Sequence, residues 1–270
     1  MSNSPSPDEM LASLRRSGYL LESRIVTALD RLGLFVESSA AYLDKKTGIS
    51  REIDVVGETF RYNEDRVGTC VKTTFVIEAV NNSFPALVMT PHKWNPNTDE
   101  DDYVPFLITP PDDESGHPFA GDVVLPEIKA KSRKDIFCQY CGFSRKKQDG
   151  DLMASHPEDL YGSIKKAVEY ALALRDGSAE WMNSTKDSYW RIFQWRPVVV
   201  FGGELHALRE DKIAQEKRAQ LRFNLHWEGR AKSVLVDLVT EAELPLFVAD
   251  VAAEDDEVEA RLHVMKNASE

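Results

Sequence analysis

Two short apolar segments each carry one acid in their interior, and this feature constrains the fold more than any other. Residues 50–56 read Ser-Arg-Glu-Ile-Asp-Val-Val, and residues 73–80 read Thr-Thr-Phe-Val-Ile-Glu-Ala-Val. β-Branched and aromatic residues of this kind favour strands. A buried, unpaired carboxylate costs on the order of several kcal/mol. We therefore expect Asp54 and Glu78 to be paired, protonated or bound to a cation.

The alternation of side chains along a strand predicts which residues accompany these acids. Asp54 shares a face with Val56, and Glu78 shares a face with Val80. Neighbouring strands lie about 4.8 Å apart, so the two acids converge if the register permits. Magnesium takes hard oxygen ligands and is commonly held by one or two carboxylates. The pattern predicts a Mg²⁺ (or Mn²⁺) site at Asp54 and Glu78; the alternative is two strand-end acids in solvent or paired with arginine.

A helix is predicted before these strands. Ser6-Pro7-Asp8-Glu9 has the form of a capping box with proline at the first helical position, and Gly33 supplies a stop. Gly18 is a candidate bend. In the second part of this helix, apolar residues recur at helical spacing, at Leu21, Ile25, Ala28, Leu29 and Leu32. Glu22 lies beside that stripe, so we expect it to approach an edge of the sheet.

The rest of the chain alternates between helical and strand patterns. A second capping signal at Ser155 precedes a helical apolar face, and strands are predicted at 197–201, 233–239 and 246–249, with a charged helical segment at 209–221. This order predicts an α/β fold with a central mixed sheet flanked by helices. We expect one domain over residues 1–250, a surface insertion at about 91–118, and an acidic, flexible tail over 251–270.

Composition limits the class of protein. Hydrophobic residues make up 42% of the chain and charged residues 29%, which is typical of a folded globular domain. No apolar run reaches the roughly 18 residues that span a bilayer, and the first residues lack the features of a signal peptide. Three cysteines are too few for a disulfide framework. We expect a cytoplasmic protein without a membrane partner.

The order and spacing of three acids resemble the PD-(D/E)XK nuclease superfamily, in the branch that has a glutamate in the first helix. The matching residues are Glu22 in Leu20-Leu21-Glu22, Asp54 in Ile53-Asp54, and Glu78 in Ile77-Glu78-Ala79-Val80-Asn81-Asn82, where the family has Glu-Cys-Lys-Asn. The likeness covers roughly residues 18–90. It implies a restriction-endonuclease-like core, bound magnesium, and hydrolysis of phosphodiester bonds in nucleic acid.

The chain departs from the family pattern at the lysine. Val80 occupies that position and offers neither a charge nor a proton. A lysine from elsewhere can replace it, and Lys72, Lys165 and Lys166 are candidates. We favour Lys165 or Lys166 as the catalytic cation, because the helix that carries them is expected to pack beside the sheet. The alternative is a catalytically inactive nuclease-like module that binds nucleic acid or a protein partner.

One segment concentrates positive charge in a chain whose formal net charge is −12. Between residues 129 and 147 a single acid accompanies seven basic residues: Lys129, Lys131, Arg133, Lys134, Arg145, Lys146 and Lys147. Such residues contact phosphates, and the interleaved aromatic rings can stack on bases. We predict that this segment binds nucleic acid, DNA in particular. The alternative is a solvated charge run whose aromatic rings pack inward.

Cys138 and Cys141 have the spacing of zinc ligands, but a structural zinc site needs four ligands and no second pair follows. His117 and His156 would complete such a site only if the fold brought them together. The alternative is a pair of buried thiols. The sequence contains no metalloprotease histidine spacing, no Gly-x-Ser-x-Gly elbow and no Walker motif, so other hydrolase classes, kinases and dinucleotide-binding enzymes lack support.

Overall fold

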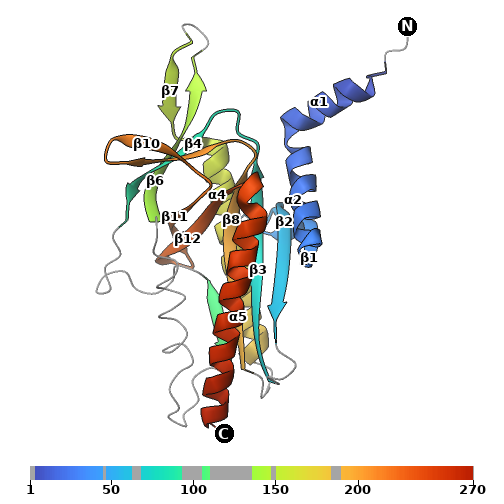
Figure 1. Cartoon of the computed structure of the whole chain (residues 1–270), viewed down its shortest axis with the longest axis vertical. Helices are drawn as coiled ribbons and strands as arrows, with labels where there is room; N and C mark the ends of the chain where they lie inside the picture. The colour runs from blue at the N-terminus through green and yellow to red at the C-terminus, as the bar shows by residue number, and fades with distance from the viewer. Residues whose placement is uncertain are drawn as a thin grey trace.

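The computed structural model describes residues 4–44, 47–62, 68–92, 105–109, 136–146, 150–183 and 190–269. A large mixed β-sheet forms the centre, and helices cover both of its faces (Figure 1). The described part of the chain is therefore an α/β structure with a central mixed sheet flanked by helices, as the order of sequence patterns predicts.

Two helices precede the sheet, and they begin and end where the sequence indicates. Helix α1 (Pro7–Ser17) starts with a complete capping box in which Ser6 and Glu9 bond reciprocally. Gly18, with φ of 90°, ends α1 and starts α2 (Tyr19–Arg31). Glycine adopts this left-handed conformation without the steric penalty that a Cβ brings. The predicted bend is confirmed, and it turns α2 onto the sheet.

Three antiparallel strands follow: β1 (Phe35–Leu43), β2 (Ser50–Arg61) and β3 (Thr69–Val80). Both predicted strands exist and are longer than expected. The apolar segment of the sequence ends at Val56, but β2 continues through the more polar residues after it as far as Arg61. Glu58 remains in the strand because Lys72 of β3 neutralises it across the ladder, at 2.7 Å.

The remaining strands complete the sheet. They are β4 (Ala86–Pro91), β5 (Phe106–Thr109), β6 (Ile136–Arg145), β7 (Leu152–Ser155), β8 (Trp190–Phe201), β9 (Leu205–Arg209), β10 (Lys212–Glu216), β11 (Arg218–Trp227) and β12 (Arg230–Thr240). The main order is β1-β2-β3-β8-β12-β11-β6-β4-β9-β10, with β5 beside β8 and β7 beside β6. The centre of this order, β3-β8-β12, is parallel, whereas β1 to β3 are antiparallel.

Helix α4 (Glu158–Asn183) covers one face of the sheet, and α2 and α5 (Leu244–Ser269) cover the other. Alternate residues of β3 divide between these layers as the pleat requires. Phe75 and Ile77 pack with α2 and α5, while Val76 packs with α4. Glu78 continues the α4 side of this alternation, and Val80 joins the apolar cluster that contains Leu160 and Ile164 of α4. The helix predicted after Ser155 is thus confirmed.

The predicted strand at 246–249 and the predicted flexible tail at 251–270 are both wrong. Residues 244–269 form α5, which begins after a single 3₁₀ turn (Glu241–Glu243). A short apolar run does not separate a strand from a buried helix. Pro245 fits the first turn of a helix, where no backbone N–H is needed. Val251, Val258 and Leu262 are buried at helical spacing and hold the segment on the sheet.

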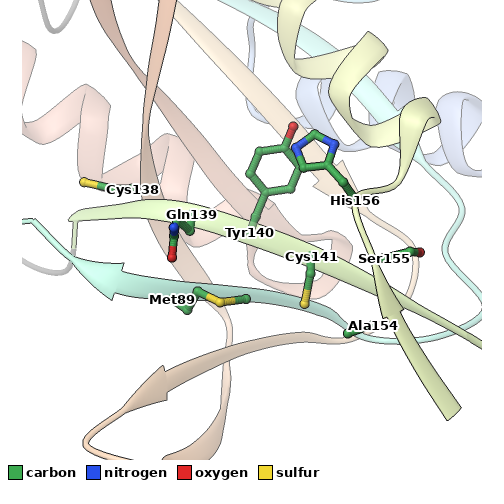
Figure 2. Close-up of a pocket in the computed structure, with 8 residues that line it drawn as sticks. All are labelled: Met89, Cys138, Gln139, Tyr140, Cys141, Ala154, Ser155 and His156. Carbon is green, nitrogen blue, oxygen red and sulfur yellow. The ribbon is translucent and has the colours of Figure 1, made fainter.

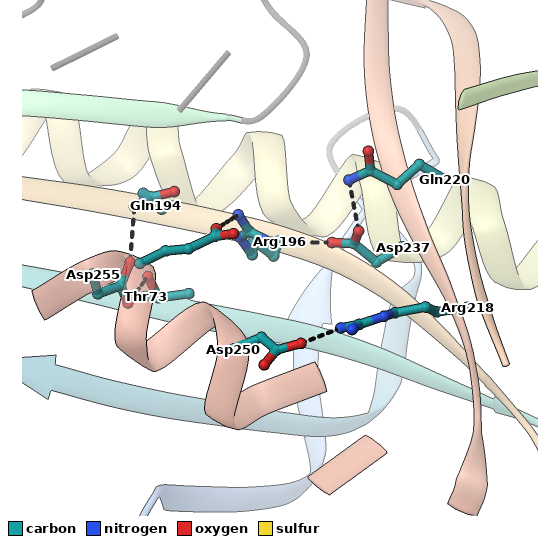
Figure 3. A network of polar contacts seen from close by, with 9 residues as sticks. Thr73, Gln194, Arg196, Arg218, Gln220, Asp237, Asp250 and Asp255 are labelled. Carbon is teal, nitrogen blue, oxygen red and sulfur yellow. Dashed lines mark hydrogen bonds and ion pairs between the residues drawn. The ribbon is translucent and has the colours of Figure 1, made fainter. Parts of the chain in front are cut away.

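Two buried acids on α5 interrupt the helical pattern of apolar residues, so the sequence does not show that this side of the helix is buried. Glu259 accepts a hydrogen bond from the Thr69 hydroxyl at 2.7 Å, and Asp255 accepts one from Thr73 at the same distance. Figure 3 shows Asp255 bonded to Thr73 and Gln194, and Arg196 of β8, which pairs with Asp237 at 3.6 Å. Hydroxyl groups on β3 thus satisfy carboxylates that the sequence alone assigns to solvent.

The charged helix predicted at 209–221 is also wrong. The residues form a tight β9–β10 hairpin and the start of β11. Glu210 and Asp211 make the turn with φ of 47° and 62°. Two-residue hairpins favour positive φ at both turn positions, for which Asn-Gly or Asp-Gly is the usual signal. Glu-Asp lacks that signal, so the alternating charges of the segment imitate a solvated helix face.

The predicted surface insertion at about 91–118 lies largely outside the described residues. Within it, Phe106–Thr109 forms β5 and pairs antiparallel with β8. Among the described helices, none is long and apolar enough to cross a membrane.

Candidate functional site

The three predicted acids come from three different elements and lie near one another. Glu78 lies near the end of β3, Asp54 lies in β2, and Glu22 is in the first turn of α2. The backbone N–H of Asp54 is 3.4 Å from Oε1 of Glu78. Glu22 is close enough for the charge of Asp54 to raise its pKa, although partial burial is the larger cause. The predicted convergence of these acids is therefore present.

The position of Asp54 depends on a local break in the β2 ladder. The pairing of β2 with β3 stops at Val55 and Ile77. Beyond it, the Asp54 carboxylate replaces the missing backbone partner, because Oδ2 accepts the N–H of Ala79 at 2.8 Å. Ile53 and Val56 pack on the α4 side, whereas Val55 packs toward α2 and α5. The strict alternation expected around Asp54 is thus broken, and the side chain is fixed by the neighbouring strand.

Glu78 is the most buried of the three acids. Its exposed fraction is 2%, and burial raises its pKa to about 7, with the charge of Asp54 acting in the same direction. Desolvation penalises the ionised form, and a nearby like charge adds to that penalty. A hydrogen bond from Lys166 opposes both effects. The site therefore has an excess of negative charge that a cation would relieve.

Lys166 supplies one cation, and it comes from the helix that faces this side of the sheet. Its Nζ lies 2.7 Å from Oε2 of Glu78 and 3.6 Å from Oδ1 of Asp54. Lys165, the next residue on α4, is exposed. One residue along a helix rotates a side chain by about 100°, so only one of the two lysines can face the acids. Of the two lysines that the sequence offered, the structure places Lys166 at the acids.

The third candidate, Lys72, lies elsewhere. Its ammonium group pairs with Glu58 at 2.7 Å and lies over the ring of Phe60, 5.1 Å from the ring centroid. These contacts occupy it on the β2–β3 hairpin, several residues before Glu78 in β3. Lys72 is thus a structural partner of the hairpin, and Lys166 is the cation beside the acids.

Val80, where the nuclease pattern would have a lysine, takes part in apolar packing. It packs against the cluster that includes Leu160 and Ile164 of α4. Lys166 lies about half a turn beyond Ile164 on the same helix. Ile164 of α4 thus belongs to the apolar cluster that Val80 joins, and Lys166 of the same helix places an ammonium group at Glu78. The apolar pocket and the cation come from one helix.

The predicted nucleic-acid-binding residues fall mostly outside the described part. Lys129, Lys131, Arg133, Lys134 and Lys147 lie there, whereas Arg145 and Lys146 are described. Arg145 ends β6 and donates to the carbonyl of Gly150 at 2.9 Å. Of the interleaved aromatic rings, Phe137 is fully buried. Arg145 and Lys146 sit beside the turn to β7, on a hairpin that extends from the sheet (Figure 1).

Cys138 and Cys141 line a pocket of about 450 Å³ with Met89, Tyr140 and His156. Figure 2 shows Cys138 pointing away from Cys141 and His156, so these side chains do not converge. Cys141 is buried, and burial raises the pKa of its thiol. Among the described residues, no group of three or more His, Cys, Asp or Glu side chains is arranged to hold a metal ion. Cys141 fits the buried-thiol alternative, whereas Cys138 is only partly buried, and His117 lies outside the described ranges.

Any cation at the acid site would therefore be held by two carboxylates, with the remaining ligands supplied by water or substrate. This is a common arrangement for magnesium. Comparisons of the chain with protein-family models, with curated proteins and with solved structures gave no match.

Proposed function

We propose that this protein is a magnesium-dependent nuclease of the PD-(D/E)XK type that acts on DNA. The observation that carries the proposal is the contact of Lys166 with Glu78, at 2.7 Å. This contact places an ammonium group beside the paired acids. The sequence pattern lacks such a group because Val80 stands in place of the motif lysine. Asp54 and Glu78 are the proposed metal ligands, and Glu22 is the third acid.

The donor set fits magnesium (or manganese). Both ligands are carboxylates, and Glu78 is buried with its pKa raised to about 7. Glu22, Asp54 and Glu78 carry more negative charge than Lys166 alone offsets, so a divalent ion would stabilise their ionised forms. When bound, such an ion stabilises charge on the phosphate and lowers the pKa of coordinated water.

The residues of the chain have distinct roles in this proposal. Lys166 places a positive charge where negative charge develops on the phosphate during hydrolysis, and such groups contribute about 10² to 10³ in rate. The Ala79 N–H fixes the Asp54 carboxylate, so that its other oxygen faces Lys166. Glu22, whose pKa is raised, is a proton acceptor for the attacking water.

The second candidate is an inactive nuclease-like module that binds nucleic acid or a protein partner. The observation that favours it is the apolar packing of Val80, which leaves Lys166 as the single lysine described beside the acids. An ammonium group held between two carboxylates can also be a structural ion pair. The two candidate functions differ in whether Lys166 contributes to a rate of DNA cleavage.

Replacing Lys166 tests the proposal directly. We expect wild type to cleave DNA with magnesium, and Lys166→Met to reduce the initial rate about 10²- to 10³-fold. Lys165→Met is the matched control, because it removes the same charge from the exposed neighbouring position and should leave the rate within a factor of about two. Single-stranded DNA, duplex DNA and RNA substrates should be compared. No cleavage by folded wild type on any of them would support the binding module.

Metal binding gives an independent measurement. Calorimetric titration with manganese should show one site that Asp54→Asn removes. Lys166→Met should bind manganese more tightly than wild type, because the ammonium group no longer competes for the Glu78 carboxylate. Tighter binding together with lost cleavage would separate the two roles of the site. Equal manganese binding by wild type and Asp54→Asn would contradict the proposed ligands.

A further inference from the structure

Helix α1 carries three apolar side chains that no described residue buries. Met10, Leu11 and Leu14 are 47%, 39% and 40% exposed, and α1 has no buried residue. Figure 1 shows α1 extending away from the sheet at the end of α2. At its C-terminal end the Asn81 amide donates to the carbonyl oxygens of Arg15 and Arg16, at 2.8 and 3.3 Å. The helix is thus anchored at one end while its apolar side faces outward.

The exposed side chains form a single stripe. Residues three and four apart lie on the same side of a helix, and Leu14 lies three residues after Leu11 and four after Met10. Helices shorter than about 12 to 15 residues are marginal in water without tertiary packing. The eleven residues of α1 have a capping box at the start but no core contact. A partner for the stripe would supply the packing that the helix lacks.

Charged residues beside the stripe indicate what that partner is. Asp8, Leu11 and Arg15 are spaced by three and four residues, so they form one row along the edge of the stripe. The acid lies in the first turn of α1 and the base lies in the last. When two copies of the helix pack antiparallel about a two-fold axis near Leu11, each Asp8 lies opposite an Arg15. Parallel packing would instead bring like charges together.

We propose that α1 is a self-association surface that pairs antiparallel with α1 of a second copy of this chain. The contact is isologous, because the same stripe and the same charged row serve both copies. Each two-fold pair buries two sets of Met10, Leu11 and Leu14 and forms two Asp8–Arg15 ion pairs. An anionic surface is a poorer partner, since Asp8 on the same row would oppose it.

Charge exchange across the two-fold axis tests the pairing. Sedimentation velocity at low salt should show wild type forming a dimer as concentration rises. Asp8→Arg and Arg15→Asp should each raise the dimer dissociation constant at least about tenfold, because two attractive pairs become repulsive. Mixing these two variants should restore association as a heterodimer, since every facing pair is then of opposite charge.

Arg16→Asp is the matched control. It changes the same charge at the same end of the helix, but it lies about 100° further round, away from the row. Its dimer constant should equal that of wild type, and circular dichroism should show equal helix content in all variants. A wild type that stays monomeric at all concentrations would overturn the proposal. So would a mixture that fails to associate, or monomeric protein that binds anionic lipid vesicles through α1.

Discussion

At the scale of single residues, the apolar contact and the positive charge on this face of β3 come from two different residues, Val80 and Lys166. Val80 points to the same strand face as Glu78 because the two are two residues apart. It packs against the apolar cluster that includes Leu160 and Ile164 of α4. Lys166 then approaches Glu78 from that helix. The charge requirement of the acids is met across the layer interface instead of within the strand.

Under the proposed nuclease function, a lysine introduced at position 80 should take over the role of Lys166. In a Lys166→Met background, Val80→Lys should raise the cleavage rate at least about tenfold over that of Lys166→Met alone. The reason is that its ammonium group would lie on the Glu78 face of the strand. Initial rates on the same DNA substrate measure the effect. Val80→Met in that background is the control, since it lengthens the side chain without adding charge. A folded, manganese-binding double variant with no recovery would contradict the prediction.

At the scale of elements, α5 is held to the sheet by buried acids as well as by apolar residues. Asp255 is 1% exposed, accepts hydrogen bonds from Thr73 and Gln194, and contributes to the network in Figure 3. Burial raises its pKa from 3.8 to about 6, while Thr73 and Arg196 act in the opposite direction. Oε1 of Gln194 has no hydrogen-bond partner among the described residues. This oxygen would accept a hydrogen bond from a neutral amide at position 255.

A carboxyl group whose pKa is raised by folding makes the folded state bind its proton more tightly than the unfolded state does. The penalty for the ionised form of Asp255 is present above about pH 6 and disappears as the pH falls toward 4. Asp255→Asn should therefore stabilise the fold at pH 8, by up to about 3 kcal/mol. The advantage should shrink through pH 6.

Chemical denaturation at several pH values measures this difference. Gln194 can accommodate the variant by turning its amide, so that Oε1 accepts from the introduced asparagine. Asp256→Asn is the control, because it neutralises the exposed neighbour on α5. A stabilisation by Asp255→Asn that grows as the pH falls would contradict a raised pKa of Asp255 as its cause.

At the scale of the whole molecule, a chain with a net charge of −12 would have to approach a polyanion through a locally basic surface. Arg145 and Lys146 lie on the β6–β7 hairpin, which extends from the sheet (Figure 1). Each lysine or arginine that contacts a phosphate releases counterions and adds about one unit to the salt dependence of binding. The hairpin carries the two residues of the predicted basic segment that the structure describes, so it is where contact with DNA can be tested.

Replacing both residues with alanine should weaken DNA binding and reduce the slope of log affinity against log salt by about two. Fluorescence anisotropy at several salt concentrations gives the slope. Lys212→Ala combined with Arg230→Ala is the control, because it removes the same total charge from other exposed positions. Equal slopes for the hairpin variant and wild type would assign Arg145 and Lys146 to the structure of the turn, where Arg145 bonds Gly150.

The sequence by itself determined the local features of this protein. The capping box at Ser6, the bend at Gly18 and strands β2 and β3 follow from short-range chemistry, namely side-chain caps, positive φ and β-branched residues. The same local pattern was sufficient to select Asp54 and Glu78, because an acid inside an apolar run requires compensation. Glu22 was selected by its place beside the apolar stripe of its helix and by the family resemblance. These features depend on a few consecutive residues, which is why they could be predicted.

Tertiary structure decided what depends on distant partners. The acids of α5 resemble a solvated tail until Thr69 and Thr73 of β3 supply their hydrogen bonds. The choice of Lys166 over Lys165 follows from the rotation of α4 on the sheet, which its packing against Val80 and the neighbouring core sets. Asp54 is held by the Ala79 N–H of another strand. Each of these outcomes rests on a contact between segments far apart in the chain, and local sequence patterns do not encode such contacts.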